Sequence, residues 1–277
     1  MIKIDGKALA EKVKDKIAKE IFKLLQKGGT RPSLAIILVG DRPDSQIYVS
    51  LKEQEARKLG IDTNRYDMEE NVSEEEILET IKFLNNDETV DAVLIQLPLP
   101  ENINTDKVMA ALDPKKDADG FLDNHPDYVT SPVLAAVKLM LEDTKVDATQ
   151  LVAGALYNSE VFGGALKKLL KDYGFKKVVG ITGRDASEVK KITSSVNVLV
   201  TAIGVPLFIK DNMIKDDAVI IDIGITKVGN KVCGDVDFDS VKHKVSFISP
   251  VPGGIGPLTI AFLFKNVLSI YKNKKTA

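Results

Sequence analysis

Two runs decide the fold: Leu34-Ala35-Ile36-Ile37-Leu38-Val39-Gly40 and, shortly after it, Asp44-Ser45-Gln46-Ile47-Tyr48-Val49-Ser50-Leu51-Lys52-Glu53. The first run is apolar throughout and predicts a buried strand that ends at Gly40. Arg42-Pro43 interrupts the strand, and Asp44 or Ser45 can cap a helix that begins there. A buried strand that leads directly into a helix is typical of a parallel α/β sheet.

The predicted helix carries two polar groups on one face. Ile47, Leu51 and Ala56 recur at helical spacing, which places Tyr48 and Lys52 one above the other because residues four apart are neighbours on a helix. Open α/β sheets bind ligands beyond the carboxyl ends of their strands, where this helix starts. An ordinary helix surface, with the lysine stem lying over the tyrosine ring, explains the same spacing.

The rest of the chain continues the alternation of helices and strands. Further helices are expected over residues 7–26, 74–84, 105–112, 133–141, 159–173, 186–192 and 258–271, and further strands over 61–68, 90–96, 151–156, 178–181, 196–202 and 218–223. This order predicts a two-domain α/β fold: an N-terminal domain with a parallel sheet, a Rossmann-like nucleotide-binding domain, and a C-terminal helix that returns to the first domain. The predicted domains are residues 1–120 with 255–277, and residues 121–254. The basic segment Lys272–Lys275 is expected to be a frayed, solvated end.

Composition narrows the class of ligand. The 277 residues carry a formal charge of -2, from 38 basic and 40 acidic residues, which offers no basic surface for nucleic acid or an anionic membrane. One cysteine, Cys233, excludes an intramolecular disulfide, and two scattered histidines, His125 and His243, predict no metal cluster. The apolar runs are too short to cross a bilayer, and the N-terminus does not resemble a signal peptide. We therefore expect a cytoplasmic protein that acts on small molecules.

Three further stretches carry candidate site residues. Gln96 ends a strand at a Pro-bounded loop, where its amide can bind a ligand or Lys52, or be satisfied by local backbone. Asp119 precedes Gly120 in a polar loop, where a helix cap or an Asx-turn explains it equally well. Pro252-Gly253-Gly254-Ile255-Gly256-Pro257 combines rigid prolines with bare backbone against which a flat ligand can lie.

Together these stretches resemble the methylenetetrahydrofolate dehydrogenase/cyclohydrolase family of one-carbon metabolism. The resemblance covers nearly the whole chain in order, through residues 45–52, 96–100, 116–121, 222–225, 234–238 and 250–259.

This resemblance implies a multifunctional enzyme with two activities, one of an oxidoreductase and one of a hydrolase. The enzyme would support purine biosynthesis. It would oxidise 5,10-methylenetetrahydrofolate to the methenyl form with NADP and hydrolyse that product to 10-formyltetrahydrofolate. The family's catalytic positions correspond to Lys52, Tyr48, Gln96 and Asp119, and the folate would lie in a cleft between the domains. Tyr48 would stack on the folate, Asp119 would hold its pterin edge, and Lys52, directed by Gln96, would activate water. Further substrate-binding positions would be Ile95, Leu97, Pro252, Gly253, Gly254, Gly256 and Pro257. The resemblance also implies a homodimer formed through the nucleotide domain and no metal.

The predicted nucleotide site departs from the family pattern. Tyr157 replaces a glycine and Asn158 an arginine, while Ser159 and Gly163 are kept. Glu160 adds a negative charge where a helix N-terminus would hold a phosphate. Arg184 can pair with a 2′-phosphate or be an ordinary surface arginine. The cofactor-binding candidates are Tyr157, Asn158, Ser159, Thr182, Arg184, Gly204 and Ile225.

Three functions remain open from these residues. The favoured one is an NADP-dependent dehydrogenase and cyclohydrolase. The second is a relative that uses NAD or keeps only the cyclohydrolase reaction. The third is a folate-binding relative without catalysis, against which the pairing of Lys52 with Gln96 argues.

Overall fold

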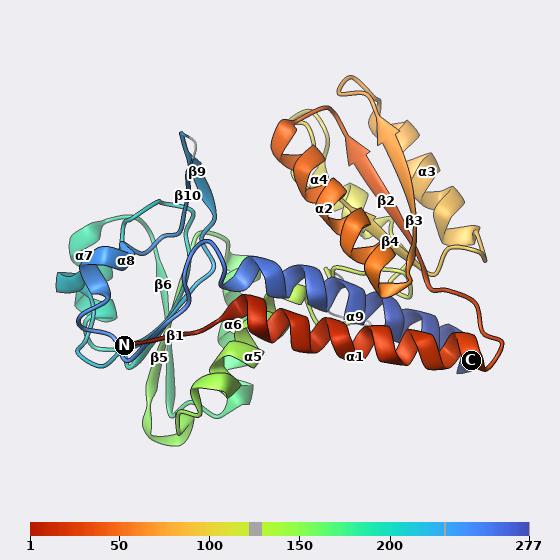
Figure 1. Ribbon diagram of the computed structural model, residues 1–277. Helices are drawn as coiled ribbons and strands as arrows, with labels where there is room; N and C mark the ends of the chain where they lie inside the picture. Colours follow the sequence, from red (N-terminus) through yellow and green to blue (C-terminus); the bar gives the residue numbers. More distant parts are fainter. Residues whose placement is uncertain (122–128, 230, 277) are drawn as a thin grey trace. The chain divides into compact units, whose positions relative to one another are not determined.

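The chain forms two compact units in a computed structural model that describes residues 1–121, 129–229 and 231–276 (Figure 1). One unit comprises residues 11–132 and 260–277, and the other comprises residues 1–10 and 133–259. Helices α1 (Gly6–Gln26) and α9 (Ile255–Thr276) supply residues to both units. The first ten residues join the second unit because β1 (Ile2–Lys3) pairs in parallel with β11 (Phe247–Ile248). His125 lies outside the described residues.

The unit of residues 11–132 and 260–277 is built on a parallel three-stranded sheet. Its order is β3 (Asp62–Met68), β2 (Ser33–Val39), β4 (Ala92–Ile95), and its remaining helices are α2 (Pro43–Leu59), α3 (Glu74–Asn86) and α4 (Thr105–Ala110). All seven residues of β2 are buried, as expected for the central strand of a sheet covered on both faces.

The two faces of β2 pack into separate cores. Leu34, Ile36 and Leu38 contact residues of α1, α2 and α9, including the fully buried Phe264. The alternate β2 residues pack against α3 and α4. The predicted return of the C-terminal helix to the first domain is therefore confirmed.

Two local expectations are wrong. Helix α9 continues through Lys272–Lys275 instead of fraying, because Lys274 Nζ lies 3.1 Å from the buried Asp91 carboxylate. Helix α2 begins with Pro43 after Arg42, so neither Asp44 nor Ser45 is its cap; proline suits a first helical position because its missing N–H is not needed there.

The unit of residues 1–10 and 133–259 contains a six-stranded parallel sheet of order β1-β11-β8-β7-β5-β6. Its longer strands are β5 (Val152–Tyr157), β6 (Lys177–Thr182), β7 (Val198–Ala202) and β8 (Val219–Asp222), and its helices include α5 (Pro132–Thr144), α6 (Glu160–Tyr173), α7 (Ala186–Thr193) and α8 (Phe238–Val241). From β5 the chain continues to the edge strand β6 and then crosses to β7 on the other side of β5, as in a Rossmann-like sheet. The short strands β1 and β11 and the antiparallel hairpin of β9 (Thr226–Val228) and β10 (Lys231–Cys233) were not predicted.

Among the described residues, we find no helix with both the length and the apolar character that a membrane span requires.

Candidate functional site

A lysine–amide pair lies at the carboxyl end of the three-stranded sheet. Gln96 directly follows β4, and its backbone N–H donates to the carbonyl of Ile37 in β2 at 2.9 Å. The Gln96 side chain donates from Nε2 to the carbonyl of Leu97 at 2.7 Å, which turns its oxygen toward α2. There Oε1 accepts a hydrogen bond from Lys52 Nζ at 2.9 Å. The expected partnership of Lys52 and Gln96 is present, and the amide has a defined orientation.

Lys52 and Asp119 influence each other's ionisation. Burial lowers the pKa of Lys52, and the Asp119 carboxylate partly opposes this change. Burial raises the pKa of Asp119 to about 6, with Lys52 acting against the rise and Asp117 adding to it. An ammonium that loses its proton more readily and a carboxyl that keeps its own more readily suit proton transfer near neutral pH.

Asp117 holds the loop that carries Asp119. Its carboxylate accepts hydrogen bonds from the backbone N–H groups of Asp119 at 3.1 Å, Gly120 at 3.0 Å and Phe121 at 2.6 Å. The Asx-turn geometry weighed for Asp119 therefore belongs to Asp117, which sequence reasoning did not identify. The Asp119 carboxylate makes no hydrogen bond to another residue within the described ranges, so it is available to a ligand. The Asp-x-Asp-Gly spacing is the signal from which this turn could have been found.

Helix α2 presents an apolar surface beside Lys52. Tyr48 is 39% exposed, and Ile47 and Leu51, one turn apart on the same helix, are 57% and 42% exposed. The residues that α2 buries are Ser45, Val49, Ala56 and Leu59, so Ile47 and Leu51 do not form its core face. A phenol ring beside two aliphatic side chains suits the stacking of a flat ligand. Sequence reasoning missed Ile47 and Leu51 as candidates for this surface because it used them only as evidence of helical periodicity.

The other predicted substrate residues lie in two places. Ile95 is the last residue of β4 and is buried in the core, whereas Leu97 is half-buried beside Gln96. Pro252, Gly253, Gly254, Gly256 and Pro257 belong to the second unit. There Gly253 has a φ of 104°, and a Cβ on Gly254 would lie 2.5 Å from the carbonyl oxygen of Pro250, so both positions require glycine. The role of this loop in substrate binding stays a prediction.

The cofactor candidates follow neighbouring parallel strands of the second unit. Tyr157 ends β5, Thr182 ends β6, and Gly204 and Ile225 follow β7 and β8. The carboxyl ends of these strands form one edge of the sheet, where doubly wound folds bind dinucleotides. The segments that the sequence proposes for the cofactor thus share one edge.

Tyr157 is accommodated by glycines rather than directed to solvent. Its ring is buried, and a Cβ on Gly163 of α6 would overlap it. Its hydroxyl lies where a Cβ on Gly180 of β6 would come within 2.8 Å, and Lys167 Nζ lies 5.2 Å from the ring centroid. The side chain fills the space between α6 and the sheet, which leaves the backbone of Tyr157 as its part nearest a ligand at the sheet edge.

Several neighbouring residues at this edge of the sheet are exposed. Asn158 Nδ2 donates to the carbonyl of Ile203 at 3.1 Å, and Gly204, with a φ of 67°, has space above its Cα. Ser159 caps α6 by accepting from the Phe162 N–H at 3.5 Å, with Glu160 in the first turn. The exposed Arg184 makes no hydrogen bond or ion pair to any residue that the structure describes. These groups fit a dinucleotide, with Glu160 as the one unfavourable charge.

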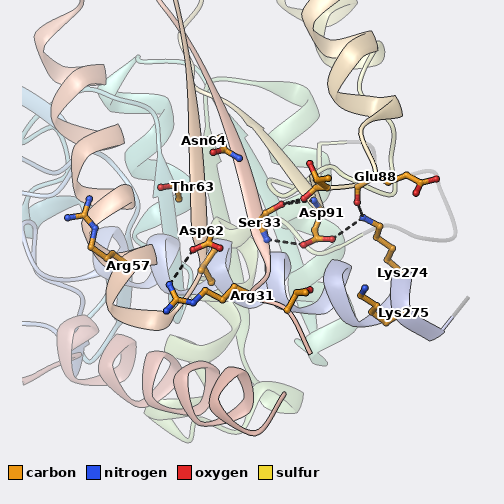
Figure 2. Close-up of a pocket in the computed structure, with 13 residues that line it drawn as sticks. Arg31, Ser33, Arg57, Asp62, Thr63, Asn64, Glu88, Asp91, Lys274 and Lys275 are labelled. Atoms are coloured by element: carbon orange, nitrogen blue, oxygen red, sulfur yellow. Dashed lines mark hydrogen bonds and ion pairs between the residues drawn. The ribbon is translucent and has the colours of Figure 1, made fainter. Parts of the chain in front are cut away.

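A separate cavity of about 940 Å³ lies at the amino end of the three-stranded sheet (Figure 2). Two of its lining cations are paired with anions: Arg31 Nη1 lies 3.4 Å from Asp62, and Lys274 Nζ lies 3.1 Å from Asp91. Because Ser33 and Asp62 begin their strands, this cavity lies at the end of the sheet opposite Gln96. Within the described residues no group of His, Cys, Asp and Glu side chains is arranged to hold a metal ion.

Comparisons with known proteins find similar domains and chains over nearly the whole sequence. The family profile of the tetrahydrofolate dehydrogenase/cyclohydrolase catalytic domain matches residues 4–119, and that of the corresponding NAD(P)-binding domain matches residues 131–275. The bifunctional protein FolD of Sulfurihydrogenibium sp. is 42% identical over 99% of each chain. The crystal structure of the bifunctional FolD enzyme of Campylobacter jejuni has a TM-score of 0.93 at 32% identity, over 99% of each chain. The Trypanosoma brucei FolD enzyme, whose structure is a complex with NADP cofactor and an inhibitor, has a TM-score of 0.93 at 29% identity, over 100% of this chain and 99% of its own.

Proposed function

The chain belongs to the tetrahydrofolate dehydrogenase/cyclohydrolase family, and from this premise we propose that it oxidises 5,10-methylenetetrahydrofolate with NADP and hydrolyses the product to 10-formyltetrahydrofolate. The observation that carries the proposal is the hydrogen bond of 2.9 Å between Lys52 and Gln96, together with the electrostatic coupling of Lys52 to Asp119.

The hydrolysis follows from the state of Lys52. The methenyl substrate is a cation, and burial already lowers the pKa of Lys52, so a neutral amine can take a proton from an attacking water. Gln96 accepts from Nζ and fixes the direction of the amine. Water adds to the methenyl carbon, one ring C–N bond breaks, and a proton leaves, which balances the conversion to the formyl product.

Substrate binding uses the groups around Lys52. We assign the flat rings of the folate to the surface of Tyr48, Ile47 and Leu51, and the N–H groups of the pterin to the carboxylate of Asp119. That carboxylate is buried enough for its pKa to rise to about 6 and has no other hydrogen-bond partner in the described part of the chain. Ionised at neutral pH, it is an acceptor for paired N–H donors.

For the oxidation, the second unit supplies the cofactor site. NADP, when bound, accepts the hydride that leaves the methylene carbon. The chain's own contribution is to orient the dinucleotide through Asn158, Ser159 and the backbone near Gly204, and to pair Arg184 with the 2′-phosphate. Arg184, which has no partner in the described part of the chain, and the NADP complex of the Trypanosoma brucei relative favour NADP over NAD.

The remaining expectations of the sequence are part of the proposal. A homodimer through the second unit is supported by β6, which is an edge strand with the half-buried Val178 and Val179. Cytoplasmic activity and a supply of formyl groups to purine biosynthesis agree with the proposed reaction. A folate binder without catalysis is not favoured, because simple binding has no need of a lysine held by an amide.

The decisive experiment mixes the purified chain with methylenetetrahydrofolate and NADP, or NAD, and follows the absorbance of the reduced cofactor and of the methenyl intermediate. Reduced NADP without accumulation of the methenyl form supports both activities. Hydrolysis of added methenyl substrate with neither cofactor reduced leaves a cyclohydrolase alone, and the absence of both reactions contradicts the proposal.

The role of Lys52 has a specific test. Lys52→Met is expected to lower cyclohydrolase kcat by about a hundredfold or more, as for loss of a general base, with a smaller effect on hydride transfer. Lys58→Met on the same helix is the matched control, because Lys58 is exposed and, among the described residues, its one ion pair is with Glu55 at 2.6 Å. Full cyclohydrolase turnover in Lys52→Met would show that another group activates the water.

A further inference from the structure

Two buried carboxylates lie at the cofactor edge of the second unit, where none of the contacts proposed so far uses them. Asp222 ends β8 and is 2% exposed, and Asp235 follows the β9–β10 hairpin and is 0% exposed. Buried acids are costly unless hydrogen bonds satisfy them, so their contacts indicate what they stabilise.

Asp235 holds the loop that follows β7. One of its oxygens accepts from the Thr201 hydroxyl at 2.9 Å and from the Ile203 N–H at 2.8 Å. The other oxygen accepts from the Val205 N–H at 3.0 Å. Since these N–H groups flank Gly204, a single carboxylate determines the path of the loop on both sides of that residue.

Asp222 in turn holds Asp235. Its Oδ1 accepts from the N–H groups of Gly224 at 2.9 Å and Asp235 at 3.1 Å, and its Oδ2 accepts from the Val236 N–H at 2.9 Å. A Cβ on Gly234 would overlap the Asp222 carboxylate, and a Cβ on Gly224 would overlap that of Asp235. The two acids therefore join the segments after β7, β8 and β10 through direct contact with their backbones.

Of the three backbone N–H groups of residues 203–205, this arrangement leaves that of Gly204 available. The Ile203 and Val205 N–H groups bond to Asp235, and the Ile203 carbonyl accepts from Asn158. The Gly204 N–H has no hydrogen-bond partner among the residues that the structure describes, and its φ of 67° is one that glycine adopts without strain. An unpaired backbone donor beside Asn158 suits a carboxamide oxygen.

The pair carries an electrostatic cost. Burial, with the nearby Asp235 carboxylate adding to it, raises the pKa of Asp222 to about 7, while backbone N–H groups act against the rise. A perturbed acid such as Asp222 is found at functional sites more often than in structural cores. The position of Asp222 at the edge where the cofactor candidates meet agrees with that rule.

We propose that Asp235, held by Asp222, is a positioning residue that sets the 203–205 loop so that the Gly204 peptide binds the carboxamide end of the nicotinamide dinucleotide. This inference rests on the proposed function. It assigns no chemical step to either acid, because both act through backbone groups.

The test is Asp235→Asn in the full chain. Its amide keeps one acceptor oxygen and places an N–H₂ against backbone donors, so kcat/KM for NADP is expected to fall by about tenfold or more. NADPH fluorescence should show weaker binding by a similar factor. Cyclohydrolase kcat and KM, measured with methenyl substrate and no NADP, should stay within about twofold of the parent.

Asp91→Asn is the matched control, a buried acid of the other unit that accepts from the Ser33 N–H at 2.8 Å. It should leave the KM for NADP unchanged even where it lowers thermal stability. Unchanged NADP kinetics in Asp235→Asn, or a parallel loss of both activities, would overturn the positioning role. If Asp235→Asn does not fold, Thr201→Val, which removes one donor to the same oxygen, must raise the KM for NADP; an unchanged KM overturns the proposal.

The parent chain distinguishes a failure of the proposed function from a failure of the positioning role of Asp235. A parent chain without dehydrogenase activity contradicts the proposed function, and NADPH binding by parent and variants then still decides the role of Asp235. If the parent is active and the variants have unchanged NADP kinetics, only the positioning role is contradicted.

Discussion

At the scale of single residues, the chemistry of the unit of residues 11–132 and 260–277 depends on side chains whose hydrogen-bonding capacity is only partly used. Lys52 has one amide partner, and Asp119 has none among the described residues although burial raises its pKa to about 6. Such groups gain their missing partners from a ligand, and this is why their environment indicates a site more directly than their spacing does.

The pH dependence of substrate binding follows from Asp119. Because its pKa is about 6, the carboxylate is ionised above that pH and protonated below it, so kcat/KM for the folate should fall as pH decreases through about 6. Asp119→Asn should remove this step from the profile and raise the substrate KM at neutral pH. A profile measured with saturating NADP checks this, and a step that persists in Asp119→Asn would assign it to another group.

The same shift affects stability with a definite sign. Folding raises the Asp119 pKa from its ordinary value of 3.8 to about 6, so the folded chain holds this proton more tightly. The contribution of Asp119 to the free energy of unfolding is therefore greatest at low pH and falls as pH increases between these two values. Urea denaturation of the parent and of Asp119→Asn across this range measures the difference.

The packing of Tyr157 predicts opposite effects of two neighbouring substitutions. Gly163→Ala inserts a methyl group into the Tyr157 ring and should lower the free energy of unfolding by about 1–3 kcal/mol. Gly164→Ala, where nothing lies within 4 Å of the added carbon, should raise it by about 0.5–1 kcal/mol. Denaturant titration compares them, and equal effects would show that the ring does not occupy this space in solution.

At the scale of elements, α9 does more than cover the sheet. Asn266, near its middle, donates from Nδ2 to the carbonyls of Ala118 at 2.9 Å and Thr130 at 3.0 Å. These contacts and those of Asp117 hold the loop of Asp119 from two sides. A helix from the end of the chain thus stabilises a loop that comes much earlier in the sequence.

Asn266→Ala is expected to leave two carbonyls without their donor. The free energy of unfolding should fall by about 1–3 kcal/mol, and the KM for the folate should rise more than the KM for NADP. Ser269→Ala on the same helix is the control, because its hydroxyl makes one hydrogen bond within the described residues, an exposed one to the Lys265 carbonyl. Equal changes in both KM values would mean that the substitution acts on stability alone.

At the scale of the whole molecule, the chemistry is divided between the units. Lys52, Gln96 and Asp119 belong to the unit of residues 11–132 and 260–277, and the cofactor candidates belong to the other. The reaction order agrees with this division, since hydrolysis needs no dinucleotide whereas oxidation needs both sets of groups.

The proposed dimer predicts a change in mass. The double substitution Val178→Lys and Val179→Lys places charges on the edge strand β6 and should prevent strand pairing between copies. Light scattering should then give the mass of one chain, 30.2 kDa, where the parent gives twice that value. A parent that is itself monomeric would contradict the dimer, and cyclohydrolase activity should survive the substitution.

The sequence by itself determined most elements and the identity of the family. Helices and strands follow from local periodicity and caps, as at Ser73, whose hydroxyl accepts from the Glu76 N–H at 3.2 Å as the capping box predicts. The candidate residues Tyr48, Lys52, Gln96 and Asp119 were found because their motifs are contiguous and keep the family's order. Short strands such as β1 and the hairpin β9–β10 were missed because two or three residues carry no period.

Only the tertiary structure decided which groups act on one another. It showed that Asp117 rather than Asp119 makes the turn, that Gly163 and Gly180 accommodate Tyr157, and that Asp222 and Asp235 hold the loop at Gly204. The physical reason is that a period along the chain reports the face on which a side chain lies. Hydrogen bonds, burial and pKa shifts depend instead on which residues folding brings together. The separation of two residues along the sequence does not predict whether they will be in contact.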